Sequence, residues 1–241
     1  MSNTVDQKEI QAFSKDAAHW WDVNGPFKPL HKLNPIRMGY IRNEICAHFG
    51  LDGSTLKPFG GLSILDIGCG GGLVCEPLAR LNAKITGIDA DPIAIEVAQA
   101  HAQEQNLNIT YINGAAESLN QQFDVVLALE VIEHVVDRHE FVQLCAKLCK
   151  PNGLAIFSTL NRTPKSFALG IVAAEYLLRW VPAGTHQWKK FVKPSEIAKS
   201  CRISGLAPTR TKGLVYSPLN DEFKLSENDL AVNYFLTAKK V

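Results

Sequence analysis

The chain has 241 residues, of which 46% are hydrophobic and 20% charged, and its formal net charge is +1. These values exclude a disordered or fibrous protein and allow one large domain with a full hydrophobic core. A charge so close to neutral gives no general attraction to nucleic acid or to an anionic membrane, so such contacts would need a local patch. We therefore predict a single domain over 1–241 and no nucleic-acid partner.

The six cysteines include no C-x-x-C pair, and the N-terminus has no basic stretch followed by an apolar one. The second feature argues against a secretory signal peptide. No run of about 18 apolar residues is present, so no segment is expected to span a membrane. These features predict reduced thiols and a cytoplasmic protein.

The first 50 residues are predicted to be helical and rich in aromatic side chains. Trp20 and Trp21 precede a turn-rich break at 25–29, and helix is expected to resume near Pro35. Exposed tryptophans leave a large apolar surface in water, so this segment should pack on the rest of the protein. We expect 1–50 to form a helical lid on the main domain.

From residue 63 onward, short apolar runs alternate with helical stretches. This spacing is typical of βαβ units and predicts a parallel sheet with helices on both faces. The expected strands are 63–67, 84–89, 109–112, 123–129 and 154–159, and the expected helices are 73–82, 92–105, 137–149 and 194–204. The last strand-like segments, near 208–216 and 231–239, should pair antiparallel. The predicted fold class is α/β, with a doubly wound, Rossmann-like sheet that is mostly parallel and ends in an antiparallel hairpin.

A glycine-rich turn over 68–72 follows the first expected strand. Glycines allow a ligand to approach the backbone closely, and the N-terminus of the following helix offers free N–H groups. Dinucleotide-binding proteins use a similar turn. Their third glycine would fall at position 73, which is Leu73 here.

Two carboxylates near the turn favour S-adenosylmethionine instead. Asp66 lies two residues before Gly68, where it would repel a pyrophosphate but attract the cationic amino-acid end of this ligand. Asp89 ends the next strand, about 20 residues on, where it can accept hydrogen bonds from both ribose hydroxyls. Gly68 and Gly70 would bring the backbone close to the ligand. Topology adds two weaker positions at the ends of later strands, Glu117 and Leu129.

Further segments resemble one specific family. The glycine turn together with Asp89 is similar to class I methyltransferases in general. Over nearly its whole length the chain resembles the ubiquinone biosynthesis O-methyltransferase family. The segments that carry this resemblance include Trp20-Trp21-Asp22, Asn34-Pro35-Ile36-Arg37, Glu130-Val131-Ile132-Glu133-His134-Val135 and Gly184-Thr185-His186. The resemblance implies methyl transfer from S-adenosylmethionine to ring hydroxyls of polyprenylated phenols and quinols, at two steps. It also implies that the donor is bound by Arg37, Gly68, Asp89 and Leu129.

Methylation of a phenol requires removal of its proton. With a pKa near 10, about one phenol in a thousand is ionised at pH 7, a handicap of roughly 4 kcal/mol. If a helix begins at Glu130, then Glu130, Glu133 and His134 share one face and can hold a divalent cation. The family resemblance associates this set with Mg²⁺. Acidic residues are also common at helix starts without any ligand. Without a metal, His134 is the first candidate for the general base and His186 the second.

An apolar stretch, Ser166–Val181, lies within an insertion at 162–192 that the basic fold does not need. As a helix it would be about 24 Å long, which is shorter than the roughly 30 Å hydrocarbon core of a membrane. Basic residues flank it on both sides. This pattern favours a helix in a membrane interface over a lid packed on the domain. We therefore expect peripheral association with the inner membrane face, and contacts with other enzymes of ubiquinone biosynthesis are a further hypothesis.

Three other functions stay open on the sequence. They are methylation of a different small acceptor, nicotinamide-linked oxidoreduction, and a non-enzymatic scaffold at a membrane. Leu73 argues against the oxidoreductase, because the dinucleotide pattern requires glycine there.

Overall fold

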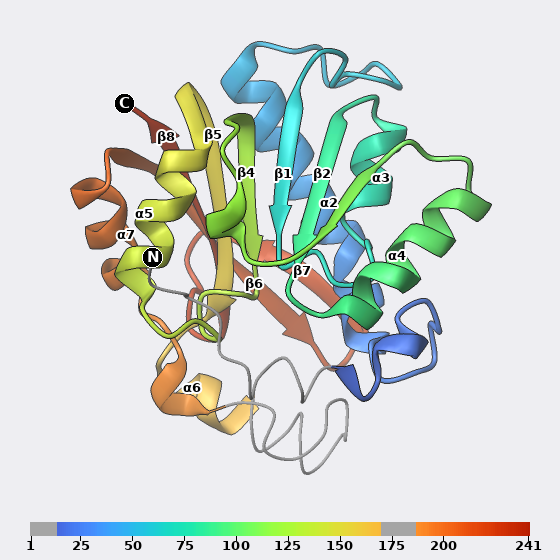
Figure 1. The fold of residues 1–241 in the computed structure, drawn as a ribbon. Coiled ribbons are helices and arrows are strands. Elements are labelled where there is room, and N and C mark those ends of the chain that lie inside the picture. The colour runs from blue at the N-terminus through green and yellow to red at the C-terminus, as the bar shows by residue number, and fades with distance from the viewer. Residues whose placement is uncertain (1–13, 170–186) are drawn as a thin grey trace.

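The computed structural model describes residues 14–169 and 187–241, and an eight-stranded sheet forms its centre (Figure 1). The strand order is β3-β2-β1-β4-β5-β8-β6-β7. The strands are β1 (Ser63–Ile67), β2 (Lys84–Asp89), β3 (Thr110–Asn113), β4 (Phe123–Leu129), β5 (Cys149–Leu160), β6 (Leu206–Ser217), β7 (Glu222–Ser226) and β8 (Asn233–Lys240). β1 to β5 pair in parallel, and β8 pairs antiparallel with β5 and β6. The predicted fold class is confirmed.

Helices cover both faces of the sheet. The longer ones are α2 (Lys28–Phe49), α3 (Cys75–Arg80), α4 (Pro92–Glu104), α5 (Arg138–Leu148) and α7 (Pro194–Ile203), and the short ones are η1 (Ala17–His19), η2 (Ala116–Ser118), α6 (Pro164–Ser166) and η4 (Trp188–Lys190). α2, α3 and α4 share a buried cluster with Ile64, whereas α5 and α7 share another with Leu65. Adjacent residues of a strand point to opposite faces, so this split defines the two helical layers.

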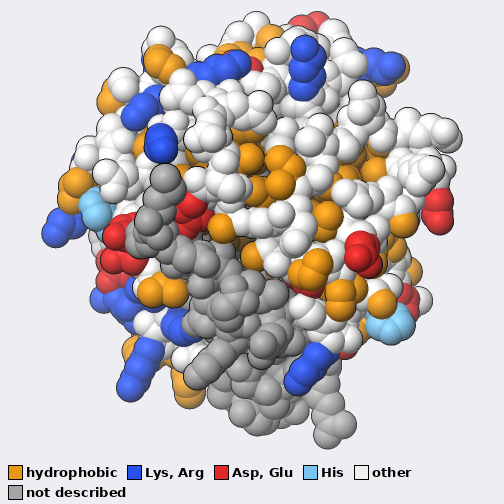
Figure 2. All heavy atoms as spheres, viewed as in Figure 1, with side chains coloured by type: hydrophobic (Ala, Val, Ile, Leu, Met, Phe, Trp, Pro, Cys, Tyr) orange, Lys and Arg blue, Asp and Glu red, His pale blue; other side chains and the backbone are white. Residues whose placement is uncertain are grey.

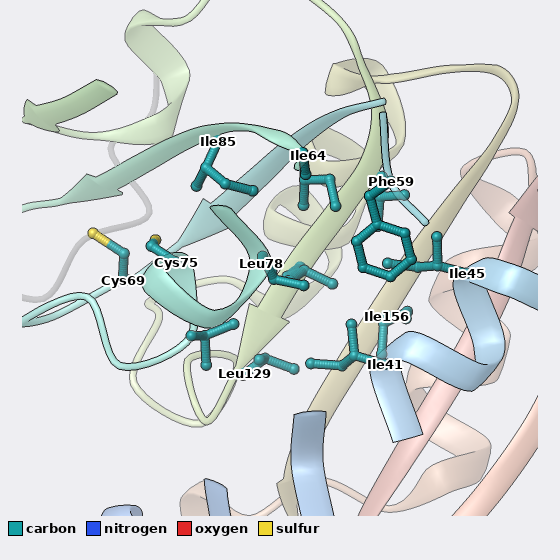
Figure 3. Close-up of a cluster of buried hydrophobic side chains, with 14 of the residues drawn as sticks. Ile41, Ile45, Phe59, Ile64, Cys69, Cys75, Leu78, Ile85, Leu129 and Ile156 are labelled. Carbon is teal, nitrogen blue, oxygen red and sulfur yellow. The ribbon is translucent and has the colours of Figure 1, made fainter. Parts of the chain in front are cut away.

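α2 forms part of the core. Its residues Ile41 and Ile45 are fully buried and lie among side chains of the sheet, close to Phe59 and Ile156 (Figure 3). The Tyr40 hydroxyl is also buried and lies 2.7 Å from that of Thr237. The helical segment expected before residue 50 therefore packs its second half directly on the sheet.

α2 begins earlier than the sequence predicted. Its first residue is Lys28, and Pro35 lies inside the helix. Pro29 occupies the first turn, where the missing N–H of proline costs no hydrogen bond. The helix ends at Phe49, and its C-cap Gly50 has a φ of 65°, the left-handed conformation that commonly terminates helices. The predicted restart near Pro35 was wrong because Pro29 already provides a favourable start.

Between β3 and β4 the chain forms only the single turn η2. Figure 2 shows hydrophobic side chains at the surface over β1, β2 and β4 on this side of the molecule. At the other end of the sheet, β7 adds an edge strand to β6 that the sequence did not predict separately. The register of β8 places Asn233 opposite Leu160, at the end of β5.

All six cysteines are buried and free. Over 14–169 and 187–241, no helix has both the length and the apolar character needed to cross a membrane.

Candidate active site

The glycine loop, residues 68–73, connects β1 to α3 at the carboxyl end of the sheet. Gly68 and Gly70 have φ values of 72° and 50°, a left-handed conformation that is strained for residues with a side chain. The Gly68 amide donates to the carbonyl of Ile88 at 2.8 Å, which ties the loop to the end of β2. Within the loop, Gly68 is exposed at the junction of the two parallel strands, where a ligand can contact its backbone, whereas residues 69–73 are buried.

Asp89 fixes this loop from the end of β2. Its Oδ2 accepts a hydrogen bond from the Gly70 amide at 2.8 Å, and its Oδ1 accepts one from the Asp91 amide at 2.9 Å. Burial raises the pKa of Asp89, and these two amides oppose the rise. Each carboxylate oxygen has a second lone pair, so Asp89 can still accept hydrogen bonds from two ligand hydroxyls.

Asp66 and Arg37 are buried groups of opposite charge that interact electrostatically. They are 3% and 5% exposed. Burial raises the pKa of Asp66 to about 7. A hydrogen bond from Cys75 Sγ at 3.4 Å and the positive charge of Arg37 both act to lower this pKa, but they do not cancel the effect of burial. Burial also lowers the pKa of the Arg37 guanidinium, while Glu130 and Asp66 oppose this. Its Nε has no hydrogen-bond partner, so a buried donor is available to an anionic group.

Glu117 and Leu129 follow β3 and end β4, as predicted. Glu117 lies in η2 and is half-buried. The Leu129 side chain is 7% exposed and lies in the hydrophobic cluster near Ile41 and Leu78 (Figure 3). Their contact with a donor stays a prediction.

Residues 130–135 follow β4 as a turn, and the helix α5 begins only at Arg138. Asp137 is its N-cap, accepting hydrogen bonds from the His139 and Glu140 amides. This agrees with the helix expected over 137–149. The alternative condition, a helix starting at Glu130 that would place Glu130, Glu133 and His134 on one face, is not met.

Glu130 is held in an unusual conformation at the end of β4. Its φ is 58°, which is uncommon for a residue with a side chain and is often found at functional sites. Ser158 Oγ donates to its Oε1 at 2.6 Å, and Asn233 Nδ2 lies 3.1 Å from both carboxylate oxygens. Sequence reasoning assigned no role to Asn233, which is distant in the chain and belongs to no local motif.

Glu133 is 3% exposed and accepts a hydrogen bond from Thr159 Oγ1 at 2.7 Å. Burial raises its pKa to about 7, the nearby Glu130 adds to the rise, and His134 opposes it. His134 is only half-buried, so it can be reached from the surface. The turn thus combines a buried carboxyl group with an accessible imidazole.

Glu130, Glu133 and His134 do not form a ready metal site. Among the described residues, no group of three or more His, Cys, Asp or Glu side chains could hold a metal ion. The two carboxylates instead have hydroxyl and amide partners from β5 and β8. The second base candidate, His186, lies outside the described residues.

Comparison with known proteins gives consistent matches. A methyltransferase domain family matches residues 65–157. The ubiquinone biosynthesis O-methyltransferase of Maricaulis maris (strain MCS10) is 54% identical over 241 residues, covering 98% of this chain and 94% of that protein. The protein of the same name from Chelativorans sp. (strain BNC1) is 49% identical over 240 residues, again with 98% and 94% covered.

Solved structures share the fold at lower identity. The magnesium protoporphyrin IX methyltransferase of Synechocystis PCC 6803, with bound SAM, matches with a TM-score of 0.63 over 100% of both chains, at 19% identity. A SAM-dependent methyltransferase from Thermotoga maritima matches with a TM-score of 0.64 over 96% of this chain and 99% of that one, at 16% identity. These likenesses concern the architecture alone.

Proposed function

The chain belongs to the ubiquinone biosynthesis O-methyltransferase family and is an S-adenosylmethionine-dependent O-methyltransferase. On this basis we propose that it methylates ring hydroxyls of polyprenylated phenol and quinol intermediates, at both O-methylation steps. One observation supports this most directly. The glycine loop, Asp66 and Asp89 lie at the ends of β1 and β2, next to β4, which leads into the Glu130–Val135 turn. The groups that we propose to bind the donor and to accept the proton would then lie at the ends of neighbouring strands.

Three charged groups would hold the methyl donor. Asp89 would accept the ribose hydroxyls, and Asp66 would attract the α-ammonium group. The unpartnered Nε of Arg37 suits the α-carboxylate. When bound, S-adenosylmethionine would supply a methyl carbon for in-line attack by the acceptor oxygen, with its sulfur leaving as the neutral thioether S-adenosylhomocysteine.

His134 would take the phenolic proton as the oxygen forms its bond to carbon. The resulting imidazolium is stabilised by the buried Glu133, whose charge interacts with it. Thr159 holds the Glu133 carboxyl group in place. The proton thus moves from the acceptor oxygen to His134, and the methyl group moves from sulfur to oxygen.

A divalent cation at Glu130, Glu133 and His134 remains a separate hypothesis. Two carboxylates and an imidazole are suitable ligands for Mg²⁺ or Zn²⁺. As placed, however, the three side chains do not converge on one position. A cation would require Glu130 to exchange its hydrogen bonds with Ser158 and Asn233 for metal coordination, so no step above depends on it.

We also propose peripheral attachment to the inner face of the cytoplasmic membrane through 166–181. A polyprenyl substrate resides in a bilayer, and an interfacial helix would bring the active site to it. Within the part of this stretch that the structure describes, 166–169, the side chains of Phe167 and Leu169 are each 47% exposed. They are therefore available for contact with a membrane. Contacts with other enzymes of the biosynthesis are a further prediction.

The proposal is tested by methyl transfer to a short-chain prenylated catechol and to the matching demethylated quinol. Both should be methylated on oxygen. Titration with S-adenosylmethionine and with NADH provides the control, since only the first should bind. Turnover of neither acceptor by a protein that binds the donor would overturn the assigned substrate class.

A further inference from the structure

Two tryptophans of the N-terminal segment lie directly against the glycine loop, and the mechanism above uses neither. Trp21 Nε1 donates a hydrogen bond to the Gly71 carbonyl at 3.0 Å. A Cβ atom added at Gly70 or Gly71 would lie 2.5 Å from the nearest atoms of the Trp20 side chain. The absence of side chains at these two positions therefore makes room for Trp20.

Both rings are themselves held in place. The Trp21 ring stacks on His101 of α4, with centroids 3.6 Å apart and planes 9° apart. The Trp20 ring stacks in the same way on Phe27, at 3.8 Å and 7°. His31 Nε2 donates to the Trp20 carbonyl at 2.8 Å, which adds a link from α2.

A second contact fixes the far end of the loop. Asn34 Nδ2 on α2 donates to the carbonyl of Leu73 at 2.8 Å. The N-terminal segment thus satisfies two loop carbonyls, those of Gly71 and Leu73, while Asp89 binds the loop amide of Gly70. The loop is held on its amide side by the sheet and on its carbonyl side by residues 20–34.

We propose that Trp21 is a positioning residue for the methyl donor, and that Trp20 forms a wall of the donor site. This rests on the proposed function, because the loop is taken to bind S-adenosylmethionine. By binding the Gly71 carbonyl, Trp21 keeps the loop amides in the orientation in which they donate hydrogen bonds to Asp89 and to the ligand. The N-terminal segment is then a part of the donor site.

The first test replaces Trp21 by phenylalanine. The Trp21→Phe variant keeps a ring that can stack on His101 but loses the N–H that binds Gly71. Its dissociation constant for S-adenosylmethionine, measured by calorimetry, should rise about two- to tenfold, as expected for one lost hydrogen bond. Hydrogen exchange at the loop amides 70–73 should become faster, while exchange in β1 and β4 stays the same.

Trp188→Phe is the matched control, because Trp188 Nε1 also donates to a backbone carbonyl, that of Thr163, at 2.9 Å. It should leave donor affinity unchanged. Equal donor affinity and equal loop exchange in Trp21→Phe and wild type would overturn the positioning role. Failure of the wild-type protein to bind the donor would instead contradict the proposed function.

Fluorescence tests Trp20 separately, since the chain has only four tryptophans. In a Trp180→Phe/Trp188→Phe protein, emission comes from Trp20 and Trp21 alone and should change when S-adenosylmethionine is added. Further replacement of Trp20 by phenylalanine should remove most of this change. An emission change that persists undiminished without Trp20 would exclude it from the wall of the donor site.

Discussion

Asp89 is hydrogen-bonded to the glycine loop and is proposed to bind the methyl donor. Its carboxylate already accepts the amides of Gly70 and Asp91, and the ribose hydroxyls would add to these. Asp89→Ala should weaken S-adenosylmethionine binding by about 1.5–3 kcal/mol, through loss of charge-assisted hydrogen bonds. Calorimetry measures this, with Asp52→Ala as a surface control. Unchanged affinity would remove Asp89 from the site.

Asp66 should make donor binding depend on pH. With a pKa of about 7 its ionised fraction rises from roughly one tenth at pH 6 to nine tenths at pH 8. Because the ionised form attracts the donor's ammonium group, affinity should rise up to about tenfold over this interval. Asp66→Asn should flatten the rise. An equally steep profile in that variant would assign the pH dependence to another group.

The raised pKa of Asp66 also affects the stability of the protein without the donor. Stability should fall as pH rises, whereas donor affinity should increase. Between the ordinary value of 3.8 and about 7, folded Asp66 holds a proton that the unfolded chain releases. The unfolding free energy should therefore fall as pH rises through this window. Binding of the cationic donor would offset that loss.

The positions of site candidates could be predicted from the sequence where they depend on neighbours in the chain. Asp66, Gly68 and Asp89 could be predicted because a strand that ends in glycines has a known geometry. Asn233 could not, because its contact with Glu130 depends on the register between β5 and β8. No pattern in the sequence fixes that register at one residue.

At the scale of elements, α2 carries both core residues and Arg37, which is proposed to bind the methyl donor. Ile45 is fully buried against the sheet, and Arg37 lies two turns earlier on the same helix. Ile45→Ala should lower the unfolding free energy by about 2–5 kcal/mol through loss of apolar contacts and the cavity left behind. Asn43→Ala, at an exposed position of α2, should change it by less than about 0.5 kcal/mol. Similar denaturation midpoints for both variants would contradict this packing.

The turn after β4 provides the test of the cation. If Glu130, Glu133 and His134 rearrange around a divalent ion, a chelator should abolish turnover and added Mg²⁺ or Zn²⁺ should restore it. The chelator already loaded with Mg²⁺ is the control for non-specific inhibition. Full activity in excess chelator, from protein that contains no metal, would reject the cation and leave His134 as the base.

Element boundaries were predictable where one pattern dominated. β1, β2 and β4 match their predicted ranges because buried parallel strands are rich in apolar residues and here lie between turn-forming segments. The helix expected over 137–149 is confirmed as α5, which Asp137 caps, so the shared helical face that Glu130, Glu133 and His134 would have had in a helix starting at Glu130 does not form. The left-handed conformation of Glu130 has no signal in the sequence.

At the scale of the whole molecule, the candidate groups converge because parallel strands all end at one edge of the sheet. The glycine loop, Asp89 and Glu130 follow three adjacent strands, β1, β2 and β4. β8 is antiparallel to β5, so its first residue, Asn233, lies at the same edge of the sheet as the carboxyl ends of the parallel strands. The segment before residue 170 also leaves the sheet at this edge, directly after β5. An attachment through that segment would place the active site near the membrane.

Membrane attachment can be tested through the apolar stretch at 166–181. Replacing Leu177 and Trp180 by charged residues should release the protein from anionic vesicles. Each change removes an apolar side chain whose burial contributes about 1.5–3 kcal/mol, so two should shift partitioning by orders of magnitude. Added salt should weaken attachment only in part, because it screens the basic flanks and leaves apolar contacts intact.

Activity separates the interfacial helix from a lid. Turnover of a short, water-soluble acceptor should survive the Leu177 and Trp180 substitutions, since the groups at the strand ends are unchanged. Turnover of a long-chain acceptor in vesicles should fall, because the enzyme no longer reaches it. Equal losses with both acceptors would indicate that the segment covers the active site. Wild-type protein that fails to bind vesicles at all would rule out the interfacial helix.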